Sequence, residues 1–297
     1  MSTQVPALLD GLVDDAAVFP PGSASLPDAV AAHRRHRASW YADLVGPLLV
    51  PATKLPALAG LLGSDERIDV GVIGDLPIGQ LDKVRAEADP RLRVRQVEAA
   101  VAKRGEDPLP GLAELVALAR RAAADATIEG ASVDGRLDVY AELPLTFGLM
   151  GALDALAAAR ADGVPIAAKF RTGGLAAELF PTPAELAAVI CACRDRELPF
   201  KLTAGLHQAV RHLDPETGFT HHGFGNVLAA TLAAADGAAA STVAELLTAA
   251  DPRPLVQWAE PRLDTARRLW VGFGSCSILE PLTDLIRLGL VNGGFKA

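Results

Sequence analysis

Residues Pro165–Thr203 read PIAAKFRTGGLAAELFPTPAELAAVICACRDRELPFKLT, and this stretch decides the fold. It begins with a short apolar run, Pro165–Phe170, continues into an Ala-rich helical pattern, Pro183–Arg194, and ends in a second apolar run, Phe200–Thr203. Continuous apolar runs of this length are typical of strands that are covered on both faces. A strand, a helix and a second strand in this order predict two parallel strands joined by a right-handed crossover.

The same order of strand and helix recurs along the chain. The expected strands are Ala16–Phe19, Leu44–Val50, Ile68–Ile73, Leu92–Val97, Leu137–Glu142, Pro165–Phe170, Phe200–Thr203 and Leu269–Phe273. The expected helices are Asp28–His36, Leu55–Leu62, Ile78–Ala88, Leu112–Ala124, Ala152–Ala161, Pro183–Arg194 and Ser277–Leu288. Eight strands in 297 residues favour an α/β fold, a single (β/α)8 TIM barrel over residues 1–297, rather than an open doubly wound sheet.

One connection is much longer than the others. Residues 206–268, between the seventh and eighth expected strands, carry His207, His212, His221 and His222. A connection of this length on a barrel is usually a lid or a specificity element. We therefore expect a helical, histidine-bearing insertion at this point of the barrel.

The composition limits the partners and the compartment. With 28 basic and 36 acidic residues the formal net charge is −8, which gives no general attraction to nucleic acid or to an anionic membrane. Met1–Asp10 lacks the basic start of a signal peptide, and the longest apolar stretch, Val227–Ala240, is too short to cross a bilayer. The three cysteines lack metal-type spacing and are interpreted as reduced thiols. We expect a cytoplasmic protein with a small-molecule substrate, and its Ala-rich outer helices are compatible with a homodimer.

Two lysines follow the apolar residues of neighbouring strands. The chain has 22 Arg but only six Lys, and Lys, unlike Arg, can lose its proton and act as a nucleophile. Lys169 and Lys201 are expected to point into the mouth of the barrel, where barrel enzymes have their active sites. A second ammonium group nearby lowers the pKa of the first and so activates it. The plainer alternative is that both lysines bind an anion, or that one reaches the surface.

Four segments at successive strand ends form an ordered set. They are Val139–Thr146, Lys169–Gly173 with the helix start Thr182–Leu186, Phe200–Gly205 and Val271–Ser277. The set resembles the motifs at the ends of strands five to eight of deoxyribose-phosphate aldolase and related class I aldolases. The second Gly of the family's seventh-strand motif is Leu206 in this chain.

This resemblance implies roles for particular residues. Lys169 would be the Schiff-base nucleophile, Lys201 would depress its pKa, and Glu142 would be a polar partner. Glu98 is the nearest counterpart of the fourth-strand Asp that transfers protons in the family. The backbone N–H groups of a loop after the eighth strand would bind a phosphate. The residues of that loop are Gly274, Ser275 and Ser277.

The remaining polar residues at the strand ends complete the candidate site. Glu98, Glu142 or His207 would move protons, and Arg171 would hold an anionic group of the substrate. Thr172 and Thr203 end the two lysine-bearing strands and are expected to bind substrate. Asp14 and Asp15, just before the first expected strand, are acid–base candidates that could equally pair locally.

The sequence therefore predicts an aldolase-like carbon–carbon lyase that forms a lysine Schiff base with a small carbonyl or phosphorylated metabolite, without a cofactor or a metal. One alternative is a metal-assisted lyase or isomerase in which the insertion histidines and the carboxylates of Glu98 and Glu142 hold Mg²⁺ or Zn²⁺. Lys169 and Lys201 would then be acid–base groups. A second alternative is a barrel without chemistry that binds a partner as a scaffold.

Overall fold

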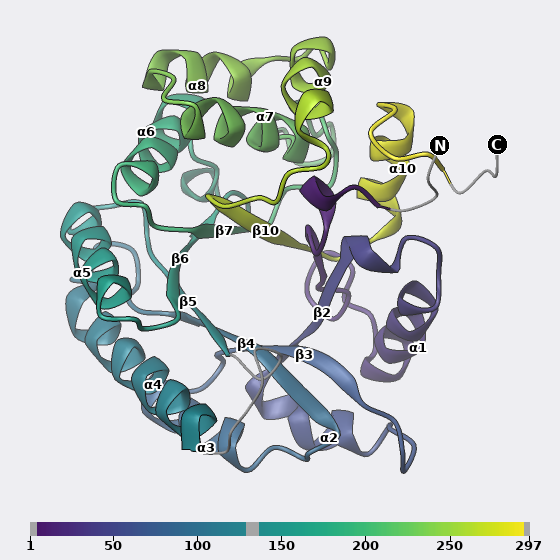
Figure 1. The fold of residues 1–297 in the computed structure, drawn as a ribbon, viewed down its shortest axis with the longest axis vertical. Helices are drawn as coiled ribbons and strands as arrows, with labels where there is room; N and C mark the ends of the chain where they lie inside the picture. The colour runs from purple at the N-terminus through teal and green to yellow at the C-terminus, as the bar shows by residue number, and fades with distance from the viewer. Residues whose placement is uncertain (1–4, 129–136, 294–297) are drawn as a thin grey trace.

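The barrel closes through its first strand. The computed structural model describes residues 5–128 and 137–293, and in this part of the chain eight parallel strands form a closed barrel in the order β1-β10-β7-β6-β5-β4-β3-β2 (Figure 1). β1 pairs with both β2 and β10, which rules out an open sheet. The strands are β1 Val13–Asp15, β2 Val45–Pro51, β3 Ile68–Ile73, β4 Leu92–Ala100, β5 Asp138–Glu142, β6 Ile166–Arg171, β7 Phe200–Thr203 and β10 Trp270–Ser275. The predicted (β/α)8 TIM barrel is confirmed.

Helices surround this barrel, as Figure 1 shows in a view that looks into the ring of strands. They are α1 Leu26–Arg37, α2 Leu55–Ala59, α3 Ile78–Ala86, α4 Leu109–Ile128, α5 Leu149–Ala161, α6 Pro183–Arg194, α7 Phe224–Ala235, α8 Ala240–Thr248, α9 Arg253–Ala259 and α10 Leu279–Arg287. Within the described residues, no helix combines the length and the apolar character that crossing a bilayer requires.

Local sequence signals explain where α6 begins. The Thr182 hydroxyl accepts a hydrogen bond from the backbone N–H of Glu185, and the Glu185 carboxylate accepts one from the N–H of Thr182 at 2.8 Å. Pro183 occupies the first helical position, where its missing N–H costs nothing. The helix therefore starts at the residue that the sequence predicts.

The wall of the barrel packs through aromatic side chains. Phe170 on β6 and Phe200 on β7 lie with ring centroids 6.0 Å apart, and Phe224 on α7 stacks on Phe273 of β10 at 5.6 Å. All four side chains are fully buried. Burial of large apolar side chains between strands and helices stabilises each by roughly 1.5–3 kcal/mol, and it fixes the strand ends that carry the polar residues.

The first strand differs from the prediction. The sequence predicts an extended Ala16–Phe19, but β1 is Val13–Asp15 and the residues after it form a turn. Asp14 and Asp15 therefore lie inside the strand, and both are buried. Because aspartate is disfavoured in strands, the sequence pattern favours the apolar residues that follow instead.

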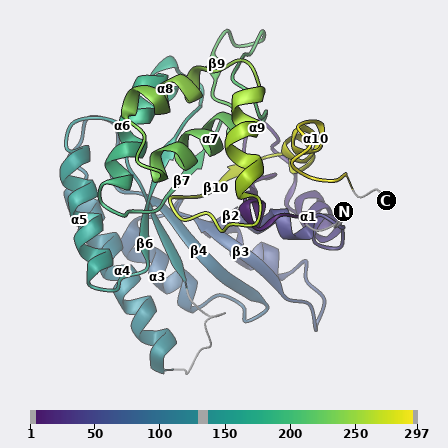
Figure 2. The same ribbon diagram turned by 45° about the horizontal axis from the view of Figure 1, so that its top comes forward.

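Residues 206–268 are not an insertion along their whole length. The segment contains a two-stranded hairpin, β8 His212–Leu213 with β9 Thr220–His221, followed by α7, α8 and α9 (Figure 2). Because α7 packs on β10 through Phe224, it belongs to the ring of helices around the barrel. The additional elements are the hairpin and the helices α8 and α9, of which α8 packs against α6 and α7.

Candidate active site

The strand register brings the predicted residues to one level of the barrel. Glu142 on β5 is paired with Lys169 on β6, and Lys169 is paired with Lys201 on β7. Residues in register on neighbouring parallel strands project to the same face of the sheet. The three side chains therefore enter the interior of the barrel side by side, Glu142 from the last residue of β5 and the two lysines from within β6 and β7.

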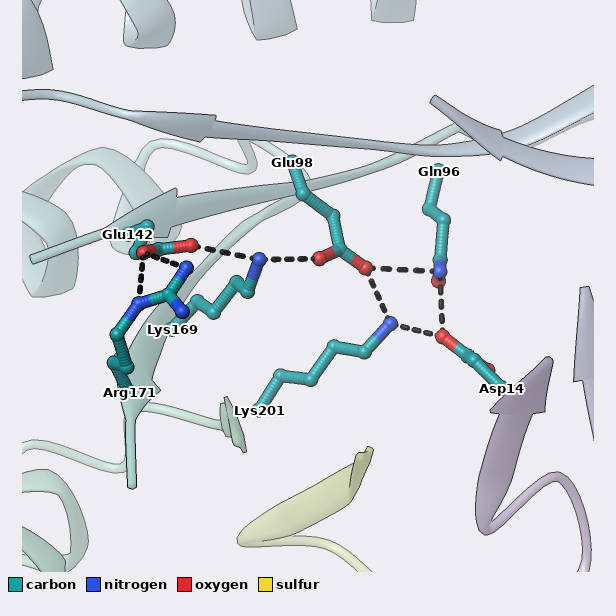
Figure 3. Close-up of polar contacts among 7 residues, drawn as sticks. All are labelled: Asp14, Gln96, Glu98, Glu142, Lys169, Arg171 and Lys201. Atoms are coloured by element: carbon teal, nitrogen blue, oxygen red, sulfur yellow. Dashed lines mark hydrogen bonds and ion pairs between the residues drawn. The ribbon is translucent and has the colours of Figure 1, made fainter. Parts of the chain in front are cut away.

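A single carboxylate bridges the two lysines. Glu98 on β4 places one oxygen, Oε2, 2.7 Å from Lys169 Nζ and the other, Oε1, 2.5 Å from Lys201 Nζ (Figure 3). Lys169 Nζ also lies 2.8 Å from Glu142 Oε2, and Lys201 donates to Asp14 Oδ2. Each ammonium group thus lies between two carboxylates.

The chain of charges continues at both ends. Arg171 Nε and Nη2 lie 3.3 Å from Glu142 Oε1, at the end that faces solvent. At the other end, Gln96 Nε2 donates to Asp14 Oδ2 at 2.6 Å and to Glu98 Oε1 at 3.0 Å. We call these seven residues the lumen cluster: Asp14, Gln96, Glu98, Glu142, Lys169, Arg171 and Lys201.

The lumen cluster is electrically balanced. Its three carboxylates alternate with two ammonium groups and one guanidinium group, so the formal charges sum to zero. Glu98, Lys169 and Lys201 are each at most 3% exposed. Burying a charge is costly unless it has an opposite partner, and this arrangement supplies one for each charge.

This pairing sets the protonation of the two lysines. Burial alone would lower the pKa of Lys169, but the charges of Glu98 and Glu142 outweigh it and raise the pKa above its usual value. Burial is likewise outweighed at Lys201, where Asp14 and Glu98 raise the pKa. The role predicted for Lys201, to depress the pKa of Lys169, stays a prediction; in the structure Glu98 lies between the two ammonium groups, and the pKa of Lys169 is raised.

The pKa values of two carboxylates in the lumen cluster, Glu98 and Asp14, shift in opposite directions. Burial would raise the pKa of Glu98, yet the two lysines lower it to about 2. At Asp14 burial is the larger influence, and the pKa is raised above its ordinary value in spite of Lys201. Within the lumen cluster burial thus raises the pKa of Asp14, whereas the two lysines hold Glu98 in its ionised form.

A pocket of about 440 Å³ opens beside the lumen cluster, over the carboxyl ends of β4, β5 and β6. Glu142 and Arg171 are part of its lining, and Lys169 lies directly behind Glu142 with a side chain that is 4% exposed. Arg104 adds a second guanidinium group to the lining. A small molecule in this pocket would meet Glu142 first and Lys169 next.

Other predicted residues lie apart from the lumen cluster. Thr172 is fully buried, and its hydroxyl donates to the carbonyl of Ala204 at 2.7 Å, so it ties the ends of β6 and β7 together. Thr203 is half-buried, and Gly274 lies near it: a Cβ built on Gly274 would be 3.9 Å from Thr203 Oγ1. His207 contacts Glu280 on α10 and not a lysine, with Nδ1 3.0 Å from Oε2.

The loop after β10 is held together by its own side chains. Ser275 Oγ donates to the Ser277 carbonyl at 2.8 Å and accepts from the Ser277 N–H at 3.3 Å. Ser277 Oγ accepts from the N–H of Glu280 at 3.2 Å. The N–H of Ser277, predicted to bind phosphate, therefore already has a partner within the loop, and phosphate binding there stays a prediction.

The predicted histidine–carboxylate metal site is not assembled. His222 Nε2 lies 2.7 Å from the carbonyl of Pro181, and His221 stacks on His212 with ring centroids 5.3 Å apart. Over residues 5–128 and 137–293, His, Cys, Asp and Glu side chains form no group of three suited to a metal ion. His212 and His221 stack within the hairpin, and His222 lies against Pro181 just before α6. His207 lies against α10, whereas the metal alternative needed these histidines beside Glu98.

Sequence reasoning missed one member of the lumen cluster, Gln96. It names Asp14 as an acid–base candidate but places it before the first strand and not within it. A signal for Asp14 exists, since the acidic pair follows the apolar residues Leu12 and Val13 directly and precedes Ala16 and Ala17. Two carboxylates in such a surrounding need buried partners.

Comparisons of the chain with models of protein families, with curated proteins and with solved structures give no match. What the chain does must therefore be inferred from the lumen cluster and from the pocket beside it.

Proposed function

We propose that this chain is an aldolase-like carbon–carbon lyase that forms a Schiff base on Lys169. The observation that carries the proposal is the position of Glu98, a β4 carboxylate that contacts both lysines. Glu98 is the residue that the resemblance to class I aldolases matches to their proton-transferring fourth-strand Asp. A lysine nucleophile, a second lysine and a shared carboxylate are the groups that imine chemistry requires.

Lys169 is assigned the nucleophile because its ion-pair partner Glu142 lines the pocket. Lys201, in contrast, is enclosed by Asp14, Gln96 and the ring of Tyr140, whose centroid is 5.0 Å from Nζ. A carbonyl carbon that displaces Glu142 from Lys169 would approach Nζ directly.

Lys169 must first lose a proton, and Glu142 is the group placed to take it. Transfer across their 2.8 Å contact turns a buried ion pair into a neutral pair, which removes charge from a poorly solvated place. The amine lone pair then forms the C–N bond while the carbonyl oxygen takes the proton from Glu142. Loss of that hydroxyl with one of the two protons still on the nitrogen releases water and leaves the protonated imine.

Glu98 and Lys201 are assigned the later proton transfers. Once Lys169 is a protonated imine, Glu98 takes the proton of the substrate's β-hydroxyl, and the bond between the α and β carbons breaks. The β fragment leaves as a carbonyl compound, and the electron pair of the broken bond forms an enamine whose carbon needs a proton. The Lys201 ammonium, with Asp14 and Glu98 behind it, is a proton donor on the neighbouring strand.

The pocket favours a substrate with an anionic group. Arg171 and Arg104 both line it, and guanidinium groups bind carboxylate or phosphate oxygens through paired N–H donors. Arg171 already contacts Glu142, so an arriving anion would compete with that carboxylate and loosen its hold on Lys169.

Hydrogen–deuterium exchange at carbon tests this proposal. Small aldehydes and ketones, with and without phosphate or carboxylate groups, are incubated with the protein in D₂O, and exchange at the carbon next to the carbonyl is followed by proton NMR. We expect exchange with at least one anionic carbonyl compound, reduced by at least about 100-fold in Lys169→Arg, which keeps the charge but cannot form an imine.

Lys83→Arg, a change on the exposed surface of α3, is the matched control and should exchange at the rate of the unaltered protein. Exchange that persists in Lys169→Arg would refute the assignment of the nucleophile. Absence of exchange with every compound would instead favour a barrel that binds without chemistry. The complete internal pairing of the lumen cluster supports that second candidate.

A further inference from the structure

A second pocket lies over another arc of the barrel mouth, and the proposed lyase chemistry does not use it. It has a volume of about 610 Å³ and is formed by residues that follow β1, β7 and β10 together with α10. Its lining includes His207, Cys276 and Glu280.

This pocket contains a thiol beside an imidazole. Cys276 directly follows β10, and its Sγ lies 3.9 Å from Nδ1 of His207. The same nitrogen lies 3.0 Å from the Glu280 carboxylate, on the first turn of α10. Cys276 is partly exposed and is one of the residues that line the pocket, so it is open to a small molecule there.

The two contacts of Nδ1 determine what the imidazole does. A carboxylate at 3.0 Å requires a proton on Nδ1, because two lone pairs would otherwise face each other. With that proton in place, the sulfur of Cys276 is an acceptor, and a thiolate accepts more strongly than a thiol. The hydrogen bond to Cys276 raises the pKa of His207; burial opposes this, and the charges of Cys276 and Glu280 add to it.

We propose that Cys276 is a covalent modification site, a thiol that His207 activates for reaction with small carbon electrophiles in this pocket. The thiol proton is released to solvent, because Nδ1 of His207 already carries its own proton, and the thiolate accepts a hydrogen bond from this Nδ1–H, which the Glu280 carboxylate orients. The sulfur then forms an S–C bond with the electrophilic carbon, and the leaving group departs with the electron pair of the bond that breaks.

The other two cysteines provide a contrast within the same chain. Cys191 and Cys193 both lie on α6 and are buried. Burial raises the pKa of the Cys193 thiol to about 12 and also raises that of Cys191. Neither should react with an electrophile while the protein is folded, so their reactivity reports unfolding.

Iodoacetamide is the probe for the test. The folded protein is treated at pH 7, the reaction is stopped at intervals, and carbamidomethylation of each cysteine is measured by peptide mass spectrometry. A free thiol of ordinary pKa, about 8.5, is only about 3% ionised at pH 7, which leaves room for strong activation. We expect Cys276 to react about 10-fold faster than N-acetylcysteine, and Cys191 and Cys193 to stay unmodified.

Two variants locate the cause. His207→Gln should slow Cys276 about 10-fold, and Glu280→Gln, on an exposed side chain, should slow it by a smaller factor. If His207→Gln unfolds, Cys191 and Cys193 become reactive, and Glu280→Gln then decides the matter. A rate at Cys276 no faster than that of N-acetylcysteine, or a rate unchanged in the folded variants, would overturn the proposal.

Discussion

Replacing Glu98 by Gln removes the charge that joins the two lysines and keeps the shape of the side chain. Each lysine then retains one carboxylate, Glu142 or Asp14, but has lost the other. Breaking a buried ion pair by removing one partner destabilises a protein by about 3–5 kcal/mol, because the remaining charge is uncompensated. Since each lysine retains one partner, we expect the lower end of that range for the free energy of unfolding at pH 7.

The pKa of Glu98 provides an independent check on this magnitude. The lysines lower the pKa from 4.5 to about 2, and a tenfold change in an ionisation constant corresponds to about 1.36 kcal/mol, so the ionised form stabilises the fold by about 3 kcal/mol. A carboxyl group whose pKa is lower in the folded than in the unfolded protein stabilises the fold at pH values above its unfolded-state pKa. This stabilisation is lost as the pH falls through the pKa that the group has in the folded protein. The difference in stability between the parent and Glu98→Gln should therefore shrink by about 3 kcal/mol between pH 5 and pH 2.

Urea unfolding at several pH values measures this difference in the free energy of unfolding. The comparison holds if the free energy of unfolding falls with urea concentration at the same slope in both proteins. The matched control is Glu87→Gln, which removes an exposed carboxylate 3.8 Å from Lys83 and should change stability by less than about 0.5 kcal/mol. A Glu98→Gln protein within about 1 kcal/mol of the parent at pH 7, or a difference that does not change with pH, would refute the reasoning.

Three further substitutions test other parts of the structure. Gly111→Ala should destabilise the fold by about 1–3 kcal/mol, because its Cβ would lie 2.0 Å from the Val101 carbonyl oxygen. Gly151→Ala, on the open surface of a helix, should instead stabilise the fold by about 0.5 kcal/mol. Equal thermal unfolding temperatures for the two variants would contradict this. Thr182→Ala removes the N-terminal cap of α6 and should cost about 1 kcal/mol in urea unfolding, and a loss below about 0.3 kcal/mol would show that the cap is dispensable. Asn226→Ala leaves the carbonyls of Leu246 and Ala249 without their donor and should lower stability by about 2–4 kcal/mol; unaltered amide exchange in α8 would argue against this.

The barrel could be predicted from the sequence because the signals for its strands and helices are local and recur along the chain. The apolar strands β3 and β7 begin and end where predicted, as does α6, which has a proline and a capping pair at its start. The position of β1 was missed because its three residues include two aspartates, whose partners come from β7 and from α1, elsewhere along the chain. A buried ion pair of this kind overrides strand propensity, and the local sequence does not show which residues are the partners.

The candidate site could be predicted only in part for the same reason. Strand ends in a barrel meet at one face, so the sequence brought Lys169, Lys201, Glu98 and Glu142 together without knowledge of their contacts. The order in which the carboxylates and the lysines alternate depends on how far each side chain reaches across the interior of the barrel. The sequence placed the two lysines next to each other, but Glu98 reaches between them and reverses the expected direction of the pKa of Lys169.

Borohydride trapping tests the central claim, that Lys169 forms an imine, most directly. The protein is incubated with the same panel of small carbonyl compounds and reduced, and the added mass is mapped by peptide sequencing. The account predicts a stable adduct on Lys169 that disappears in Lys169→Arg and persists in Lys83→Arg. Adducts confined to surface lysines such as Lys54 or Lys83, with Lys169 unmodified by every compound, would contradict it.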